Sequence, residues 1–280
     1  MKQYSLAVAI LAACATLAAC GKQGADTPDA SAGKPAPTGM IAEAARQAEA
    51  QAKIAALPKP DMARPLTDYA KLDGGEQLMF LYLAAARLPP DYAAIASEFS
   101  SDYRDTSDTF RKQDLLTALM PQIDARIGAA VQQPYAWMEV KASDNLAGYD
   151  FQRGGFPVQE FQQEMTRYFN DAHSYRLTWA NREALMFATV KDEAVAREIE
   201  GMRNEYNNNP RLKVYFFAQA VDLDSKHVKA YVTRVQITDR SGRVLAEYGP
   251  DASAATVTAS PAAEQSDDAA AFSAAAAAGY

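Results

Sequence analysis

The spacing of apolar residues changes once along the chain, near Pro134. Between Gln77 and Val131 the apolar side chains recur every three or four residues, which is typical of helices with one buried face. After Pro134 the chain becomes rich in aromatic and β-branched residues, which predicts strands. Helices first and strands after favour an α+β class, with N-terminal helices followed by a mostly antiparallel β-sheet.

The ends of the expected helices are marked by capping residues and prolines. A helical run over Gln77–Leu88 stops at a Pro-Pro pair, and Asp91 is placed to cap a short helix after it. A longer amphipathic segment covers Leu115–Val131 and contains Pro121. Either that helix kinks at the proline or a new helix starts there.

The second part of the chain predicts several strands and one further helix, over Lys191–Asn204. The expected strands are Tyr135–Val140, Tyr175–Trp179, Leu185–Val190, Leu212–Leu223, Val228–Ile237 and Val244–Tyr248. Short polar turns join the last three strands, so we expect them to form an antiparallel meander.

The first residues are typical of a targeting segment. Lys2 precedes a nearly unbroken apolar run over Ser5–Leu17, which is too short to cross a bilayer but suits a signal peptide. The run ends in Leu17-Ala18-Ala19-Cys20-Gly21, which resembles the lipobox of bacterial lipoproteins. A second match at Cys14 would leave too short an apolar region, so we expect lipid on Cys20.

Composition divides the rest of the chain. Residues 1–19 are the expected signal peptide, and residues 20–64 are a lipidated flexible tether that contains an Ala-rich helix over Met40–Leu57. Residues 65–250 are expected to form a single globular domain. Residues 251–280 are rich in Ala, Ser and Asp with little to bury, and we expect this tail to be disordered.

Charge and cysteine content restrict the partners. The net charge of −7 argues against nucleic acid and against a polybasic grip on anionic lipid. Attachment to the membrane is expected through the lipid on Cys20 alone. No free thiol or disulfide would remain in the mature chain, so the domain would depend on its core.

Motifs for common catalytic chemistry are missing. There is no phosphate-binding glycine loop, so no nucleotide is expected, and there is no serine-hydrolase elbow. Two histidines and no Cys-x-x-Cys pair give no zinc site. We expect no cofactor and no metal.

Carboxylates are the remaining candidates for catalysis. Asp102, Asp105 and Asp108 form either an acidic site wall or, more often for such runs, a solvated loop with a helix cap. Asp222 and Asp224 lie in a predicted hairpin and lack the further oxygen ligands of a calcium loop.

The segment Gly148–Val158 is the most unusual stretch. It combines Tyr149, Phe151, Arg153 and Phe156 with a Gly-Gly pair, and these four residues are the candidate binding surface. The same residues also suit a core strand, a turn and an aromatic side chain over a sheet edge, so both interpretations stay open.

Residues from about Pro65 to Glu247 resemble an uncharacterised family of bacterial envelope proteins, domain of unknown function 4852. The segments that carry the resemblance are Gln77–Tyr82, Asp102–Asp108, Tyr149–Gln152 with Gly155–Pro157, and Ala196–Glu200. The family has no established activity, so the resemblance assigns no catalytic role to any residue.

These observations predict a lipid-anchored, non-catalytic lipoprotein that binds a protein or cell-wall component of the envelope. The residue after Cys20 is Gly21 and not the Asp that commonly signals inner-membrane retention. This favours the periplasmic face of the outer membrane in a Gram-negative host. Two alternatives stay open. One is a carboxylate-dependent cell-wall hydrolase, and the other is a periplasmic inhibitor or immunity protein whose acidic charge suits a basic enzyme.

Overall fold

The computed structural model describes residues 38–141, 145–162, 165–172, 174–205 and 209–251. The predicted signal peptide, Cys20 and the tail after Asp251 lie outside these residues. The chain divides into two units, Met1–Ala52 and Lys53–Tyr280. Helix α1 (Thr38–Ala55) runs across that division and agrees with the expected Ala-rich helix. Its described side chains are exposed.

The first helices of the second unit begin at polar caps. They are α2 (Gly75–Ala86), α3 (Tyr92–Phe99), α4 (Ser101–Asp105) and α5 (Thr109–Gln132). The Asp91 carboxylate accepts the Ala94 N–H at 3.1 Å and begins α3, and the Asp108 carboxylate begins α5 in the same way. Helix α5 continues through Pro121, so no new helix starts there.

The Gly74-Gly75 pair lies at the start of α2. The Asp171 carboxylate, from a loop far along the chain, accepts the Gly75 N–H at 2.8 Å. A Cβ on Gly75 would lie 2.8 Å from the Ala172 backbone nitrogen, so only glycine lets this loop cap the helix.

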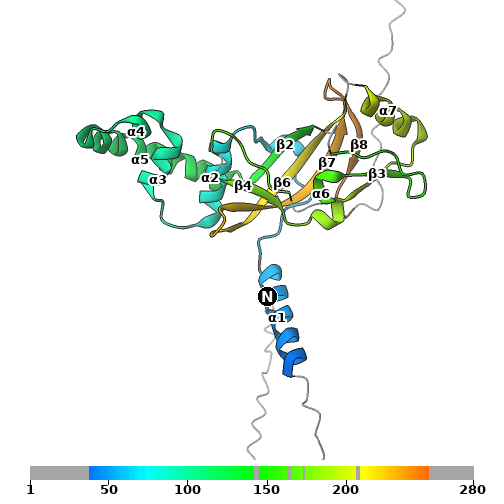
Figure 1. Cartoon of the computed structure of the whole chain (residues 1–280), viewed down its shortest axis with the longest axis horizontal. Coiled ribbons are helices and arrows are strands. Elements are labelled where there is room, and N and C mark those ends of the chain that lie inside the picture. Colours follow the sequence, from blue (N-terminus) through cyan, green and yellow to red (C-terminus); the bar gives the residue numbers. More distant parts are fainter. Residues whose placement is uncertain (1–37, 142–144, 163–164, 173, 206–208, 252–280) are drawn as a thin grey trace, which may run out of the picture. The chain divides into compact units, whose positions relative to one another are not determined.

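One sheet of six strands forms the centre of the unit (Figure 1). Its strands are β1 (Ala70–Lys71), β2 (Tyr135–Lys141), β4 (Arg176–Trp179), β6 (Arg211–Asp222), β7 (His227–Thr238) and β8 (Val244–Tyr248). The order is β1-β2-β6-β7-β4, and β8 pairs with the far end of β7. β6, β7 and β8 form the predicted antiparallel meander, whereas β1 and β4 are parallel edge strands.

The two faces of this sheet differ in composition. The inner face is apolar and joins the main core, with Phe216, Val232 and Leu177 fully buried together with residues of α2. The outer face carries a small aromatic cluster of Tyr69, Tyr135 and Tyr215. This alternation is the expected period-2 pattern of a strand.

Residues 58–64, which the sequence assigned to the tether, contact the outer face. Gln219 donates to the Pro58 carbonyl at 3.0 Å, and the Asp61 N–H donates to the Tyr135 hydroxyl. The guanidinium of Arg64 lies 4.4 Å from the centre of the Tyr135 ring. The folded unit therefore includes residues before Pro65.

A second, two-stranded sheet pairs β3 (Gly155–Pro157) with β5 (Phe187–Thr189). Three short helical elements accompany it: α6 (Gln159–Gln162), the 3-10 turn η2 (Arg182–Leu185), and α7 (Glu193–Asn204). The strand expected over Leu185–Val190 is thus shorter and follows a 3-10 turn. Turn η1 (Leu66–Asp68) precedes β1.

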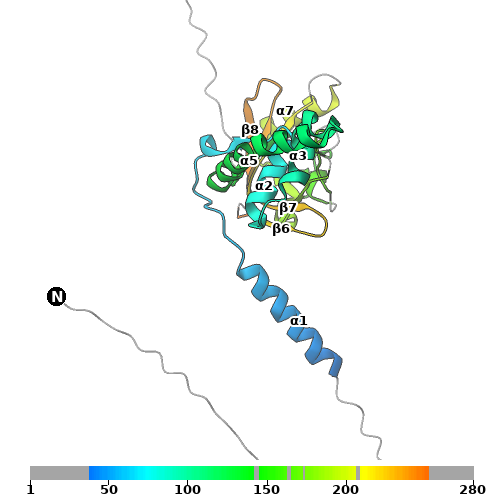
Figure 2. The same ribbon diagram turned by 90° about the vertical axis from the view of Figure 1, so that its left-hand side faces the viewer.

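Helices α3, α4 and α5 lie at one end of the central sheet, and α7 lies at the other (Figure 1). The view from the α5 end shows α2, α3 and α5 gathered in front of the sheet (Figure 2). Exposed residues of α5 and of the region around α7 are therefore far apart on the unit, which provides matched control positions.

Candidate binding site

The predicted surface segment forms a tight turn before β3. We call Tyr149–Gly154 the Phe151 turn. The Asp150 carboxylate accepts the N–H groups of Gln152 at 2.9 Å and Arg153 at 3.1 Å, which closes the turn. Gly154 has φ +69°, a left-handed conformation that glycine adopts without strain.

The glycine after the turn seats it against the second sheet. A Cβ on Gly155 would overlap the Ala188 carbonyl oxygen and lie 2.8 Å from the Thr189 Cα. This close approach lets β3 pair with β5, so the turn leaves the sheet at a fixed position.

Tyr149 holds the other end of the turn. Its N–H donates to the Glu200 carboxylate of α7 at 3.1 Å, and its hydroxyl donates to the Val190 carbonyl at 3.1 Å. Its ring meets the rings of Phe151 at 5.0 Å and Phe156 at 5.1 Å, both edge to face. The turn is therefore bound to three separate parts of the fold.

Phe151 is the exposed tip of this arrangement. Its side chain is 89 % exposed although its neighbours are fixed. Arg153 is also exposed, and its guanidinium lies 3.7 Å from the centre of the Phe187 ring. The structure thus brings Tyr149, Phe151 and Arg153 together, with only Tyr149 partly buried.

Phe156 requires a correction. The sequence placed it on the candidate binding surface, but its side chain is 0 % exposed and belongs to the main core. The reason is that β3 is buried where it pairs with β5: Gly155 and Phe156 are both buried, and the Phe156 ring packs edge to face against the Tyr149 ring. Phe156 is therefore part of the core and not of the exposed surface.

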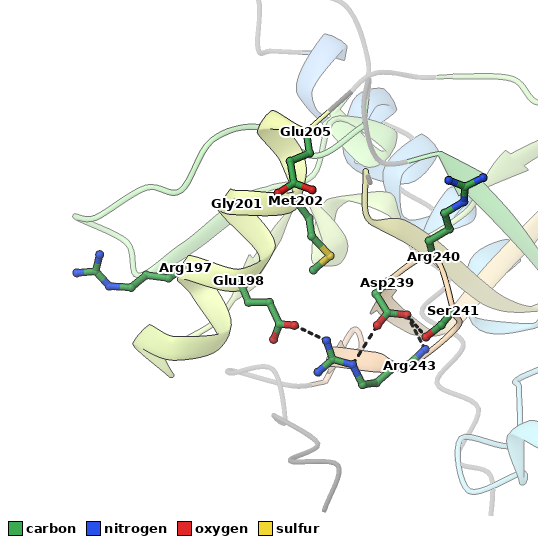
Figure 3. A pocket seen from close by; sticks show the side chains of 9 residues that line it. All are labelled: Arg197, Glu198, Gly201, Met202, Glu205, Asp239, Arg240, Ser241 and Arg243. Carbon is green, nitrogen blue, oxygen red and sulfur yellow. Dashed lines mark hydrogen bonds and ion pairs between the residues drawn. The ribbon is translucent and has the colours of Figure 1, made fainter. Parts of the chain in front are cut away.

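A hollow of about 660 Å³ lies between α7 and the β7–β8 turn (Figure 3). The Met202 side chain points into the space between them, while Arg197 points away. Gly201 also lines the hollow, and a Cβ there would meet no atom within 4 Å. Close packing therefore does not explain why glycine occupies position 201, where it costs the helix about 1 kcal/mol relative to alanine.

The charges of this hollow are organised around Arg243. Its guanidinium contacts Glu198 and donates to the Asp239 carboxylate at 3.0 Å (Figure 3). Burial opposes ionisation of Asp239, but hydrogen bonds from Ser241 and Arg243 outweigh it and lower the pKa of this carboxyl. A general acid needs a carboxyl with a raised pKa, so Asp239 is not suited to that role.

A fully buried carboxylate lies elsewhere, at Glu160 of α6. It accepts hydrogen bonds from the Trp179 indole at 2.8 Å and from the Arg167 Nε at 3.0 Å, and Arg167 also donates to Asn145 at 3.4 Å. Its side chain is 0 % exposed, so no substrate reaches it. The group holds α6 against β4. Sequence reasoning missed it because Gln-Glu-Phe-Gln carries no catalytic or metal-binding pattern.

Three of the other carboxylates that the sequence singled out, Asp105, Asp108 and Asp222, make structural contacts. Asp108 is the cap of α5, as the capping interpretation predicted. The Asp105 carboxylate forms an ion pair with the neighbouring Arg104, whose Nε lies 3.5 Å from the Asp105 Oδ1. Asp222 accepts the N–H groups of Asp224 and Ser225 in the β6–β7 hairpin, and the Ser225 backbone bond is the main cause of its lowered pKa. These residues do not converge with Glu160 or Asp239 on one cleft.

Within the described part of the chain, no three His, Cys, Asp or Glu side chains are grouped to hold a metal ion. His173 lies outside the described residues, and His227 begins β7. No described helix is long and apolar enough to cross a membrane.

No family model, no curated protein and no solved structure matches this chain. The resemblance to domain of unknown function 4852 therefore stays a prediction.

Proposed function

We propose that this chain is a lipid-anchored, non-catalytic binding protein of the bacterial envelope that holds a protein partner through the Phe151 turn. The anchor is lipid on Cys20, and the location is the periplasmic face of the outer membrane in a Gram-negative host. One observation carries the binding role: Phe151 is 89 % exposed on a turn that is fixed at both ends.

Exposure alone would not support this proposal, because single exposed apolar residues are ordinary on protein surfaces. The difference here lies in the fixation of the turn. Tyr149 bonds to Glu200 and Val190, and Asp150 closes the backbone. A turn whose backbone is already fixed loses less entropy when it binds, so more of the area that Phe151 buries contributes to affinity.

Arg153 adds a polar contact beside the aromatic tip. Its guanidinium stacks on Phe187, which restricts its position while part of the group stays in solvent. Aromatic and Arg side chains together form the usual centre of a protein interface. A partner with an apolar pocket next to an acidic group would match this pair.

Crosslinking in living cells tests the proposal. A photoreactive amino acid in place of Gln152, which is exposed between Phe151 and Arg153, should capture a specific envelope protein. Phe151→Ala in the same chain should abolish the capture. The matched control is Phe110→Ala, since Phe110 is also 87 % exposed but belongs to α5, which Figure 1 shows at the end of the sheet away from α7.

Capture that survives Phe151→Ala, or that is lost equally in Phe110→Ala, would contradict this role for the turn. The identity of the captured protein also decides between two kinds of binding. A basic enzyme that loses activity in the complex would favour the inhibitor interpretation, to which the acidic net charge of −7 is suited.

A further inference from the structure

The outer face of the six-stranded sheet carries positive charge that the net charge of the chain conceals. Strand register decides which residues share this face. Lys71 pairs beside Trp137, Glu139 faces Lys213, and Lys141 faces Arg211. Since Trp137 and Tyr215 belong to the outer aromatic cluster, their alternate neighbours lie on the same side.

The face continues across β7 and β4, although the β6–β7 pairing shifts register twice along it. Arg234 pairs with Tyr215, and Lys229 and Arg176 lie beyond the outer aromatic cluster. The strands therefore place four lysines and three arginines on this face, against three acids, Glu139, Glu247 and Asp222. Two of these acids are paired within the face, Glu139 with Arg211 and Glu247 with Arg234.

This excess of positive charge contrasts with the net charge of −7 for the whole chain. The strand residues of this face therefore carry a positive excess, although Asp73, which follows β1, pairs with Lys71 at 3.1 Å. Lys71, Lys141, Lys229 and Arg176 are exposed, and the other cations of the face are partly exposed. The sequence alone argued against a basic contact with lipid because it showed only the net charge.

We propose that this basic face docks against an anionic lipid bilayer surface. The cations are spread over five neighbouring strands, which spans roughly 20 Å at the usual strand spacing. Such a spread fits a surface with distributed charge better than one small ligand. Attraction of this kind acts near anionic lipid and is screened by salt.

Trp137 gives the face an amphipathic centre. Its half-buried ring has the Lys213 ammonium 5.5 Å and the Lys71 ammonium 6.0 Å from its centre. Tryptophan rings with neighbouring lysines are typical of the membrane–water boundary, where the ring meets the headgroup level and the ammonium meets phosphate. This feature favours lipid over an anionic cell-wall glycan as the partner.

Vesicle co-sedimentation tests the proposal with the chain from residue 20 that carries Cys20→Ser, so that no lipid is attached. We expect binding to vesicles with about one-third phosphatidylglycerol and no binding to pure phosphatidylcholine vesicles. Binding should disappear between about 0.1 M and about 1 M salt, as the Debye length falls from about 10 Å to about 3 Å.

A matched pair of charge reversals locates the contact. Lys141→Glu with Lys229→Glu changes the basic face, whereas Arg111→Glu with Lys191→Glu makes the same change of net charge at exposed positions outside the sheet. The face variant should bind vesicles at least about tenfold more weakly, and the control variant should bind like the unmodified chain. Thermal melts of both variants check that they fold.

Equal losses in the two variants would show that only net charge matters and would overturn the proposal. So would the absence of vesicle binding by the folded parent chain. Binding to purified cell-wall sacculi without binding to vesicles would assign the face to an anionic glycan instead. None of these outcomes depends on the Phe151 turn, so the two proposals fail or stand separately.

Discussion

The Glu160 carboxylate accepts a 2.8 Å hydrogen bond from the Trp179 indole inside the core, and this contact joins α6 to β4. Arg167 donates to the same carboxylate and is itself about one-quarter exposed. A buried charge is tolerated only when it is paired and hydrogen-bonded. We therefore expect the stability of the unit to depend on this group.

Glu160→Gln should destabilise the protein strongly, because the substitution leaves the Arg167 guanidinium partly buried without its counter-charge. Removing one partner of a buried pair costs about 3 kcal/mol at the lower end of the usual range. In a domain of this size that corresponds to a fall of roughly 6–12 °C in the melting temperature. A thermal melt followed by circular dichroism measures it.

The control for this prediction is Glu193→Gln, which removes an ion pair to Arg197 in which both side chains are 78 % exposed. Exposed pairs contribute between about 0 and 1 kcal/mol, so the melt should hardly move. Similar shifts in the two variants would show that the Glu160 group does not stabilise the core as described.

Stability should also decline at alkaline pH through buried tyrosines. Burial raises the pKa of Tyr248 well above its ordinary value of 10.0, and the nearby Glu160 charge adds to the effect. The folded state keeps this proton while the unfolded chain releases it near pH 10. The protein therefore keeps its full free energy of unfolding below pH 10, and this free energy falls as the pH rises above 10. The pKa values of Tyr69, Tyr175 and Tyr215 shift in the same direction, each mainly through burial.

Tyr248→Phe should make this decline shallower, although it also removes a 3.3 Å hydrogen bond to the Leu185 carbonyl. Denaturant unfolding between pH 8 and about 11 gives the slope that is compared. Tyr168→Phe is the control, because Tyr168 is 60 % exposed. An unchanged slope for Tyr248→Phe would contradict the burial argument.

Two phenylalanines five residues apart should respond differently to truncation. Phe156→Ala opens a cavity in the core and should cost about 3–5 kcal/mol of stability. Phe151→Ala removes an exposed ring and should leave the free energy of unfolding nearly unchanged. Denaturant unfolding of both variants measures the difference, and comparable losses would mean that Phe151 packs on the fold.

Much of the fold was predictable because local chemistry determined it. Asp91 and Asp108 were identified as caps from their places before apolar runs, and the structure confirms both. The hairpin around Asp222 and the antiparallel meander followed from strand composition and polar turns. In each case the residues that decide the structure are close together in the sequence.

The features that were missed depend on contacts between distant residues. The parallel pairings of β1 and β4, and the cap that Asp171 supplies to α2, join segments far apart in the chain. The candidate site shows the same limit. Phe151 and Phe156 look equivalent in the sequence, and only the pairing of β3 with β5 separates the exposed ring from the buried one.

Lipid attachment is predicted to depend on one thiol. Cys20→Ser should block maturation and abolish incorporation of radiolabelled palmitate, because the thiol is the group that accepts the lipid. Cys14→Ser is the matched control and should label normally. A Cys20→Ser chain that still labels would move the site to Cys14 or remove it altogether.

The affinity of the crosslinked partner for purified variants tests the binding role most directly. Isothermal titration with the unmodified chain, Phe151→Ala and Phe110→Ala compares two exposed phenylalanines that differ in their surroundings. A central anchor contributes about 2 kcal/mol or more, so Phe151→Ala should weaken the complex about thirtyfold while Phe110→Ala leaves it unchanged. Equal affinity of a folded Phe151→Ala chain and the unmodified chain would contradict the account.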